Sequence, residues 1–135
     1  MSLDPTNQDL SEIITKATAQ SVADAVARLS EAIVAKGMQI FAIIDHSGEA
    51  KAVGLDLRDT KLVIFGSPRA GTPVMAYAPL SALDLPLKVL VWDHGGQTKV
   101  SYTAPDVLAA RYALTSELAQ IRAPIDALTD SIIIK

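Results

Sequence analysis

Hydrophobic positions along the chain follow two periods, one typical of helices and one typical of strands. The helical period is clearest in an apolar face with steps of four, three and four residues, formed by Val22, Val26, Leu29 and Ile33. Ser21 precedes this face as an N-cap, with Asp24 three residues later in the manner of a capping box. Gly37 fits the position just past the helix end. These signals predict a helix that ends before Gly37.

Five further segments are predicted to be strands because they are short and rich in β-branched and apolar residues. They are Glu12–Thr18, Met38–Ile44, Lys61–Ser67, Leu85–Asp93 and Lys99–Thr103. Residues 38–44 are apolar on both alternating faces, which predicts a strand covered on both sides. The last two segments form a predicted hairpin, since two glycines lie between them. Residues 49–60 have a weak pattern, which we interpret as a loop or a short helical turn.

Three more helical segments complete the predicted order. Thr72 is predicted to cap a short helix with Pro73 at its first position, and Thr103 to cap another with Pro105 in its first turn. The last third is helical, and Pro124 inside it predicts a kink or a break. Residues 132–134 are three isoleucines, which are expected to dock on the chain's own core or on another subunit.

The order of elements predicts an α+β fold, a five-stranded antiparallel sheet with helices on one face. Short connections between successive strands favour antiparallel pairing. Residues 11–135 are predicted to form a single α+β domain, and residues 1–10 a disordered N-terminal arm. Two edge strands and the isoleucine tail favour a homodimer.

Composition narrows the class of protein. The chain has 135 residues, a formal net charge of -3 and no dense basic run, which argues against nucleic acid and anionic membranes as partners. No apolar run approaches the roughly 20 residues that a membrane helix needs. We therefore expect a cytoplasmic protein with no membrane partner. The absence of cysteine excludes disulfides, thiol catalysis and cysteine metal sites.

Three segments resemble the family of domain of unknown function 302. They are FAIIDHSGEAKAVGLDL, TKLVIFGSPRAGTPVMAYAPLSALDLPLKVLVW and VSYTAPDVLAARYAL. The signature is Asp45-His46, Phe65-Gly66, Pro68, Gly71-Thr72-Pro73 and the strand entry Leu85-Pro86-Leu87-Lys88. The resemblance implies a strand-helix-four-strands-helix fold with a TATA-binding-protein-like outline, a homodimer and no established activity. Ser67 stands where the family most often has asparagine, so an amide donor is lost there.

The first candidate site is the segment Gly66–Thr72, which has the glycine spacing of a phosphate loop between a strand and a helix. The lysine of the nucleotide-binding version is missing, which argues against nucleotide hydrolysis. A helix start at Thr72 and the guanidinium of Arg69 would suit a carboxylate or phosphate. The alternative is that Gly66 and Gly71 only permit a tight turn and Thr72 only caps.

The second candidate is Asp45-His46. Neighbouring side chains on a strand point to opposite faces, so these two are not expected to touch. His46 suits a general acid or base, supported by Asp45 or Asp93. The only other histidine, His94, lies at a hairpin tip. Two histidines without a clear third ligand are weak evidence for a metal site, so no metal is predicted. The alternative is a capping or core-edge histidine.

The third candidate is a set of polar strand residues, Lys61, Lys88, Asp93 and Tyr102. Lys88 shares its face with Leu90 and Trp92, and Tyr102 lies across the hairpin, so the group could line a pocket with an aromatic wall. The alternative is ordinary cross-strand packing.

We interpret the chain as a homodimeric module for a small polar or anionic ligand, with no cofactor identified. The predicted ligand-binding residues are Asp45, His46, Gly66, Ser67, Arg69, Gly71 and Thr72. One alternative is an enzyme that uses His46 as acid or base. The other is a structural or interaction protein in which the segment is only a turn.

Overall fold

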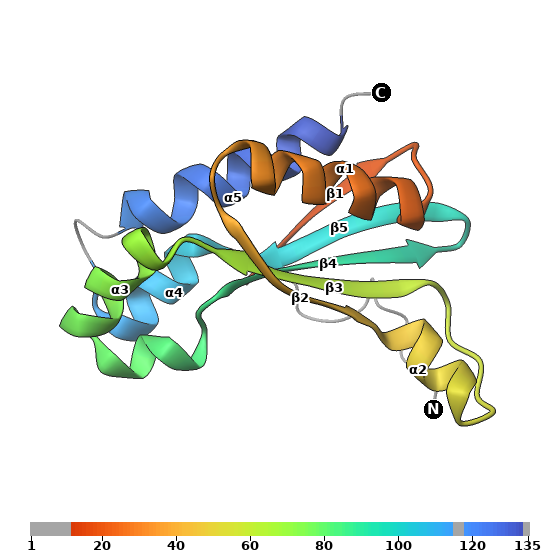
Figure 1. Cartoon of the computed structure of the whole chain (residues 1–135), viewed down its shortest axis with the longest axis horizontal. Coiled ribbons are helices and arrows are strands. Elements are labelled where there is room, and N and C mark those ends of the chain that lie inside the picture. Colours follow the sequence, from red (N-terminus) through yellow and green to blue (C-terminus); the bar gives the residue numbers. More distant parts are fainter. Residues whose placement is uncertain (1–11, 115–117, 134–135) are drawn as a thin grey trace.

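The computed structural model describes residues 12–114 and 118–133, which form one sheet with the long helices across one of its faces and shorter helices at its ends (Figure 1). The strands are β1 (Ile13–Thr18), β2 (Gln39–Asp45), β3 (Thr60–Gly66), β4 (Leu87–His94) and β5 (Gln97–Thr103). The helices are α1 (Val22–Ala35), α2 (His46–Ala52), α3 (Pro68–Tyr77), α4 (Pro105–Tyr112) and α5 (Leu118–Ile133), with a 3-10 turn η2 (Pro79–Leu83).

The sheet has the order β1-β5-β4-β3-β2, and every neighbouring pair is antiparallel. Helices α1 and α5 lie side by side across one face of it (Figure 1). Between these helices and the sheet lies a core whose fully buried members include Leu29, Val63, Phe65, Val89 and Leu128. The predicted α+β fold with a five-stranded antiparallel sheet is therefore confirmed.

Helix α1 begins and ends where local signals place it. The hydroxyl of Ser21 accepts a hydrogen bond from the backbone N–H of Asp24 at 3.0 Å. Past the last turn, Gly37 has a φ of +76° and donates to the carbonyl of Val34, while Met38 donates to the carbonyl of Ile33. This pair of bonds is a Schellman motif, which satisfies carbonyls that the helix end leaves free. Both predicted boundaries are confirmed.

The hairpin between β4 and β5 is also as predicted. Gly95 and Gly96 form its two-residue turn, with φ values of +60° and +91°. Two successive residues with positive φ define the turn that matches the twist of the flanking strands, and glycine adopts them without steric cost.

Strand β2 is less covered than its apolar sequence predicts. It lies at the end of the sheet, and its Phe41 and Ile43 side chains are 46% and 45% exposed. The prediction of a strand covered on both sides is therefore wrong for this chain by itself. The reason is the strand order, because a terminal strand has a neighbour on one edge only and extends past the covering helix.

Two predictions about the last third are corrected or refined. The cap of α4 is Ala104, which makes no side-chain bond, so Thr103 is not the cap. Pro124 lies inside α5 and does not end it. Ile132 is buried in the chain's own core, whereas Ile134 and the predicted arm of residues 1–10 lie outside the described residues.

A partly buried polar cluster links α5 to the sheet. The ammonium of Lys16 on β1 donates to the hydroxyl of Thr129 at 2.7 Å and to the carboxylate of Asp130 at 2.7 Å. On β5 the hydroxyl of Tyr102 donates to Asp126 at 2.6 Å, and burial raises the pKa of this tyrosine. These bonds satisfy polar groups that would be costly to bury alone.

Candidate functional site

The segment Gly66–Thr72 is the end of a strand followed by the first turn of a helix. Ser67 is extended, with φ −121° and ψ 119°, and its hydroxyl accepts a hydrogen bond from the N–H of Ala70 at 3.4 Å. Pro68 then occupies the first helical position, which its fixed φ suits. Helix α3 therefore begins at Pro68, and the predicted start at Thr72 is wrong.

The error has a local cause. Ser67-Pro68 and Thr72-Pro73 are both a hydroxyl residue followed by proline, and each pair fits a cap with proline at the first position. The structure uses the first pair, and Pro73 lies inside α3. Consequently there is no phosphate-type loop here, and Gly71 is a helical residue rather than a turn residue.

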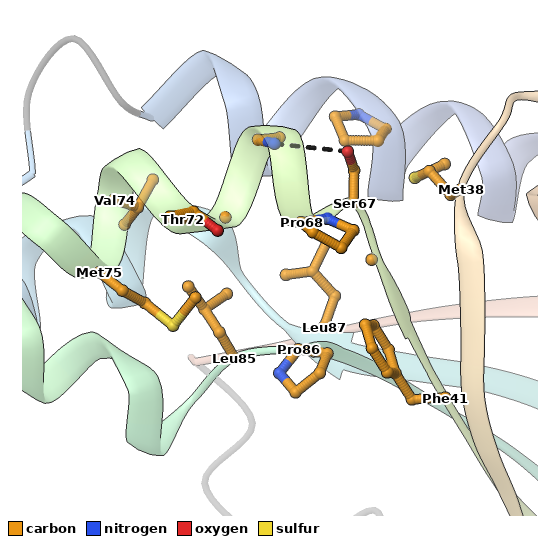
Figure 2. Close-up of a pocket in the computed structure, with 14 residues that line it drawn as sticks. Met38, Phe41, Ser67, Pro68, Thr72, Val74, Met75, Leu85, Pro86 and Leu87 are labelled. Atoms are coloured by element: carbon orange, nitrogen blue, oxygen red, sulfur yellow. Dashed lines mark hydrogen bonds between the residues drawn. The ribbon is translucent and has the colours of Figure 1, made fainter.

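A cavity of about 330 Å³ lies beside this helix start, and we call it the α3 cavity (Figure 2). One wall is α3 itself, including Gly71 and Met75. The opposite walls come from Phe41 on β2 and from the segment that leads into β4, including Leu85 and Pro86 (Figure 2). The lining is almost entirely apolar, so the cavity suits the apolar body of a small molecule.

Hydroxyl groups are the polar side-chain atoms of this lining. The Ser67 hydroxyl is engaged with the N–H of Ala70, whereas the Thr72 hydroxyl makes no hydrogen bond to a described residue. Thr72 is therefore able to orient a ligand, and Ser67, which only accepts in its bond with Ala70, can still donate its own O–H. Arg69 is exposed and does not line the cavity.

Two small residues leave the α3 cavity open. A methyl group added at Gly66 would stand 3.7 Å from Pro86 and 3.9 Å from Phe41. One added at Gly71 would stand 3.8 Å from the terminal methyl of Met75. Both are ordinary van der Waals separations, so the glycines are not needed for backbone packing at these points. They leave space between residues that line the cavity.

Asp45 has a structural role at the far end of β2. Its carboxylate caps α2, accepting bonds from the Ser47 hydroxyl at 2.7 Å and the Gly48 N–H at 2.9 Å. These bonds, the Ser47 bond foremost, hold the pKa of Asp45 below its usual value. The alternative considered for this pair was a capping or core-edge histidine, but the residue that caps α2 is Asp45, and His46 is the first residue of the helix.

His46 lies away from the α3 cavity. It is the exposed first residue of α2 and directly follows Asp45. Asp45 pairs with Lys61 at one end of β3, whereas Gly66 lies at the other end of that strand. Five residues of extended strand separate the ends by about 17 Å. The predicted single site containing both His46 and Gly66–Thr72 is therefore corrected (Figure 1).

Among the described residues there is neither a cluster of metal ligands nor a bond from His46 to the carboxylates predicted to support it. The part of the chain that the structure describes contains no group of three His, Asp or Glu side chains able to hold a metal ion. Within the same residues, no hydrogen bond or ion pair joins His46 to Asp45 or Asp93.

The third predicted group is divided between the two faces of the sheet. Lys88, Leu90 and Trp92 lie together, as predicted, on the face away from α1, where they line a groove of about 730 Å³. We call it the sheet groove. Tyr102 is also among the residues that line the sheet groove, as predicted, although its side chain is 3% exposed and its hydroxyl donates to Asp126 on α5. Lys61 contacts Asp45 at 3.9 Å instead.

Four of the predicted ligand-binding residues, Gly66, Ser67, Gly71 and Thr72, line the α3 cavity, but sequence reasoning missed other parts of its wall. Met38, Phe41, Met75 and Leu85 all line it, and none was predicted as a site residue. Of these missed residues, only Leu85 carried a sequence signal, because the strand entry Leu85-Pro86 belongs to the family signature. The others are apolar residues whose convergence depends on the strand order.

Comparison with known proteins identifies the family and the fold of the chain. The family described as "Domain of unknown function DUF302" matches residues 14–132. A crystal structure of an uncharacterized conserved DUF302 protein from Bacillus stearothermophilus superposes with a TM-score of 0.81 and 21% identity, covering 89% of this chain and 97% of that one. This likeness shows the fold.

Two curated relatives carry a different description. "Fluoride-specific ion channel FluC 1" from Brucella suis biovar 1 (strain 1330) is 36% identical over 105 residues, 77% of this chain and 41% of that protein. "Fluoride-specific ion channel FluC 2" from Brucella melitensis biotype 1 is also 36% identical over 105 residues, covering 77% and 39%. The chain thus spans about two fifths of their length. Among the helices that the structure describes, none has both the length and the apolar character needed to cross a bilayer.

Proposed function

The chain belongs to the DUF302 family, and we propose that it is a homodimeric module that binds a small, largely apolar molecule in the α3 cavity. The observation that carries the proposal is the cavity itself. Its volume of about 330 Å³ lies at the lower end of the range for small-molecule sites.

The lining specifies the chemistry of the ligand. Met38, Phe41, Met75 and Leu85 offer apolar and polarisable surface, and methionine adapts readily to irregular shapes. The Thr72 hydroxyl offers one hydrogen bond. An uncharged molecule with an apolar body and a single hydroxyl or carbonyl group satisfies both. This lining favours such a molecule over the polar or anionic ligand predicted from the sequence, because a buried anion here would lack a paired cation.

Self-association is proposed through β2. This terminal strand has a free edge, and Phe41 and Ile43 on it are nearly half exposed. Edge pairing about a two-fold axis would cover both side chains and remove an edge open to aggregation. Because Phe41 also lines the α3 cavity, a partner at β2 would close one of its walls.

Native mass spectrometry tests the ligand proposal. We expect the purified protein to carry a discrete excess mass that disappears on denaturation, or to acquire a saturable thermal shift with 1-hexanol. Ala70→Leu fills part of the α3 cavity and should abolish either signal. Ala76→Leu, on the same helix but exposed and outside the lining, should leave it intact. Equal behaviour of the two variants would contradict the proposal.

A separate substitution on β2 tests whether the protein is a dimer. Ile43→Lys places a charge on the exposed edge without touching the α3 cavity, and should give the mass of one chain in place of two. Val34→Lys, an exposed position on α1, is the matched control and should remain dimeric. A wild-type protein that is monomeric at micromolar concentration would refute the dimer.

A further inference from the structure

The sheet groove is a second concave surface, separate from the α3 cavity. It lies on the face of the sheet that no described helix covers (Figure 1). Leu62 on β3 and Leu90 and Trp92 on β4 form its floor, and Ile13 and Leu57 line its sides. At about 730 Å³ it is large enough to hold most of a small molecule.

The floor of the groove is held in one arrangement by hydrogen bonds. The indole N–H of Trp92 donates to the Ser101 hydroxyl at 2.9 Å, and that hydroxyl is 2.9 Å from the hydroxyl of Thr15. Ser101 is almost fully buried beneath them. Since the polar atom of the indole is already satisfied, the ring presents apolar surface without any need to rearrange. Such preorganisation lowers the entropic cost of binding.

The charges of the groove have one sign. Arg58, Lys88 and Lys99 line it, and none of its lining residues is Asp or Glu. This asymmetry contrasts with the net charge of -3 of the whole chain. None of the three cations forms a salt bridge with a described residue, although Lys88 lies near enough to Asp84 to contribute to the lowered pKa of that carboxyl. A fixed surface of one sign favours a ligand of the opposite sign.

We propose that the sheet groove binds a small amphipathic carboxylate, with its aliphatic body on Leu62, Leu90 and Trp92 and its anionic end beside the lysines. A second copy of this chain fits the groove less well. Two-fold pairing of this face would bring the same cations toward one another, and no lining residue supplies a carboxylate to pair with them. The groove is independent of the α3 cavity, whose lining shares none of these residues.

Trp92 allows a direct test because it is the only tryptophan of the chain. Its fluorescence in the full-length protein is followed during titration with octanoate, kept below the concentration at which octanoate forms micelles. We expect a saturable change that weakens as salt is raised, because exposed charges are screened. Uncharged 1-octanol, of the same chain length, should bind more weakly.

Matched variants separate charge from folding. Lys88→Gln and Lys99→Gln should each weaken octanoate binding about two- to fivefold, the range for a partly exposed ion pair. Lys36→Gln, at the end of α1 on the helical side, should change nothing. These three lysines are exposed or half-buried, so each variant should fold, and circular dichroism checks this.

Three results would overturn this proposal. One is equal affinity for octanoate and 1-octanol with no effect of either lysine variant. Another is a complete lack of response of Trp92 to octanoate. A third is a change in Trp92 emission on dilution that follows the mass from two chains to one, which would assign the groove to a second copy. None of these results bears on the α3 cavity. Its Ala70→Leu variant is tested by native mass spectrometry and by the thermal shift with 1-hexanol.

Discussion

Replacing glycine by alanine at two positions should change stability in opposite directions. Gly71 lies in the fourth position of α3, outside the left-handed region, and an added methyl would meet only the Met75 methyl at 3.8 Å. Alanine is favoured over glycine inside a helix, so Gly71→Ala should raise the free energy of unfolding by about 0.5–1 kcal/mol. For a chain of this length, that corresponds to roughly 2–4 °C in Tm.

The same substitution at Gly37 should destabilise the protein. Gly37 has open space around its Cα but a φ of +76°, which alanine adopts only with strain. We expect Gly37→Ala to cost about 1–2 kcal/mol, measured with Gly71→Ala by urea denaturation followed by circular dichroism. If Gly71→Ala is instead as destabilising as Gly37→Ala, Gly71 is a turn residue. The assignment of the helix start to Pro68 would then be wrong.

Two further predictions concern polar contacts. Thr129→Val removes a buried acceptor of the Lys16 ammonium and should lower the free energy of unfolding by about 1–2 kcal/mol in urea denaturation; a change near zero would show that the bond contributes little. Asp84 accepts hydrogen bonds from the Tyr112 hydroxyl and from Arg111, and these bonds lower its pKa. Its contribution to stability is therefore full above the ordinary carboxyl pKa of about 3.9 and is lost as the pH falls through the lower pKa of the folded state. Asp84→Asn should cost about 1 kcal/mol at pH 7, and the gap between variant and wild type should narrow below about pH 4; a gap independent of pH would contradict this assignment.

Elements with complete local signals were predictable from the sequence. Ser21 and Gly37 mark the two ends of α1 by side-chain and backbone hydrogen bonds within a few residues. The glycine pair of the β4–β5 hairpin likewise requires only the conformation of two residues. Such signals act between residues that are close in the sequence, so the local sequence is enough to predict where these elements begin and end.

Features that depend on contacts between distant segments were not predictable in the same way. The apolar pattern of β2 is the same whether the strand is central or terminal, and its exposure follows from the strand order. At α3, Ser67-Pro68 and Thr72-Pro73 both satisfy the local preferences for a helix start, so the sequence does not distinguish between them. The α3 cavity joins Phe41, Gly71 and Leu85 from three separate segments, and the sequence marks only part of that convergence.

The central claim is that the α3 cavity binds a small apolar molecule, and its methionines report on it directly. The chain has three methionines, and two of them, Met38 and Met75, line the cavity. With ¹³C-labelled methionine methyl groups, titration with 1-hexanol should shift both of these signals along one saturating curve. Unchanged Met38 and Met75 signals, or shifts that grow in proportion to the alcohol added without saturating, would contradict the claim.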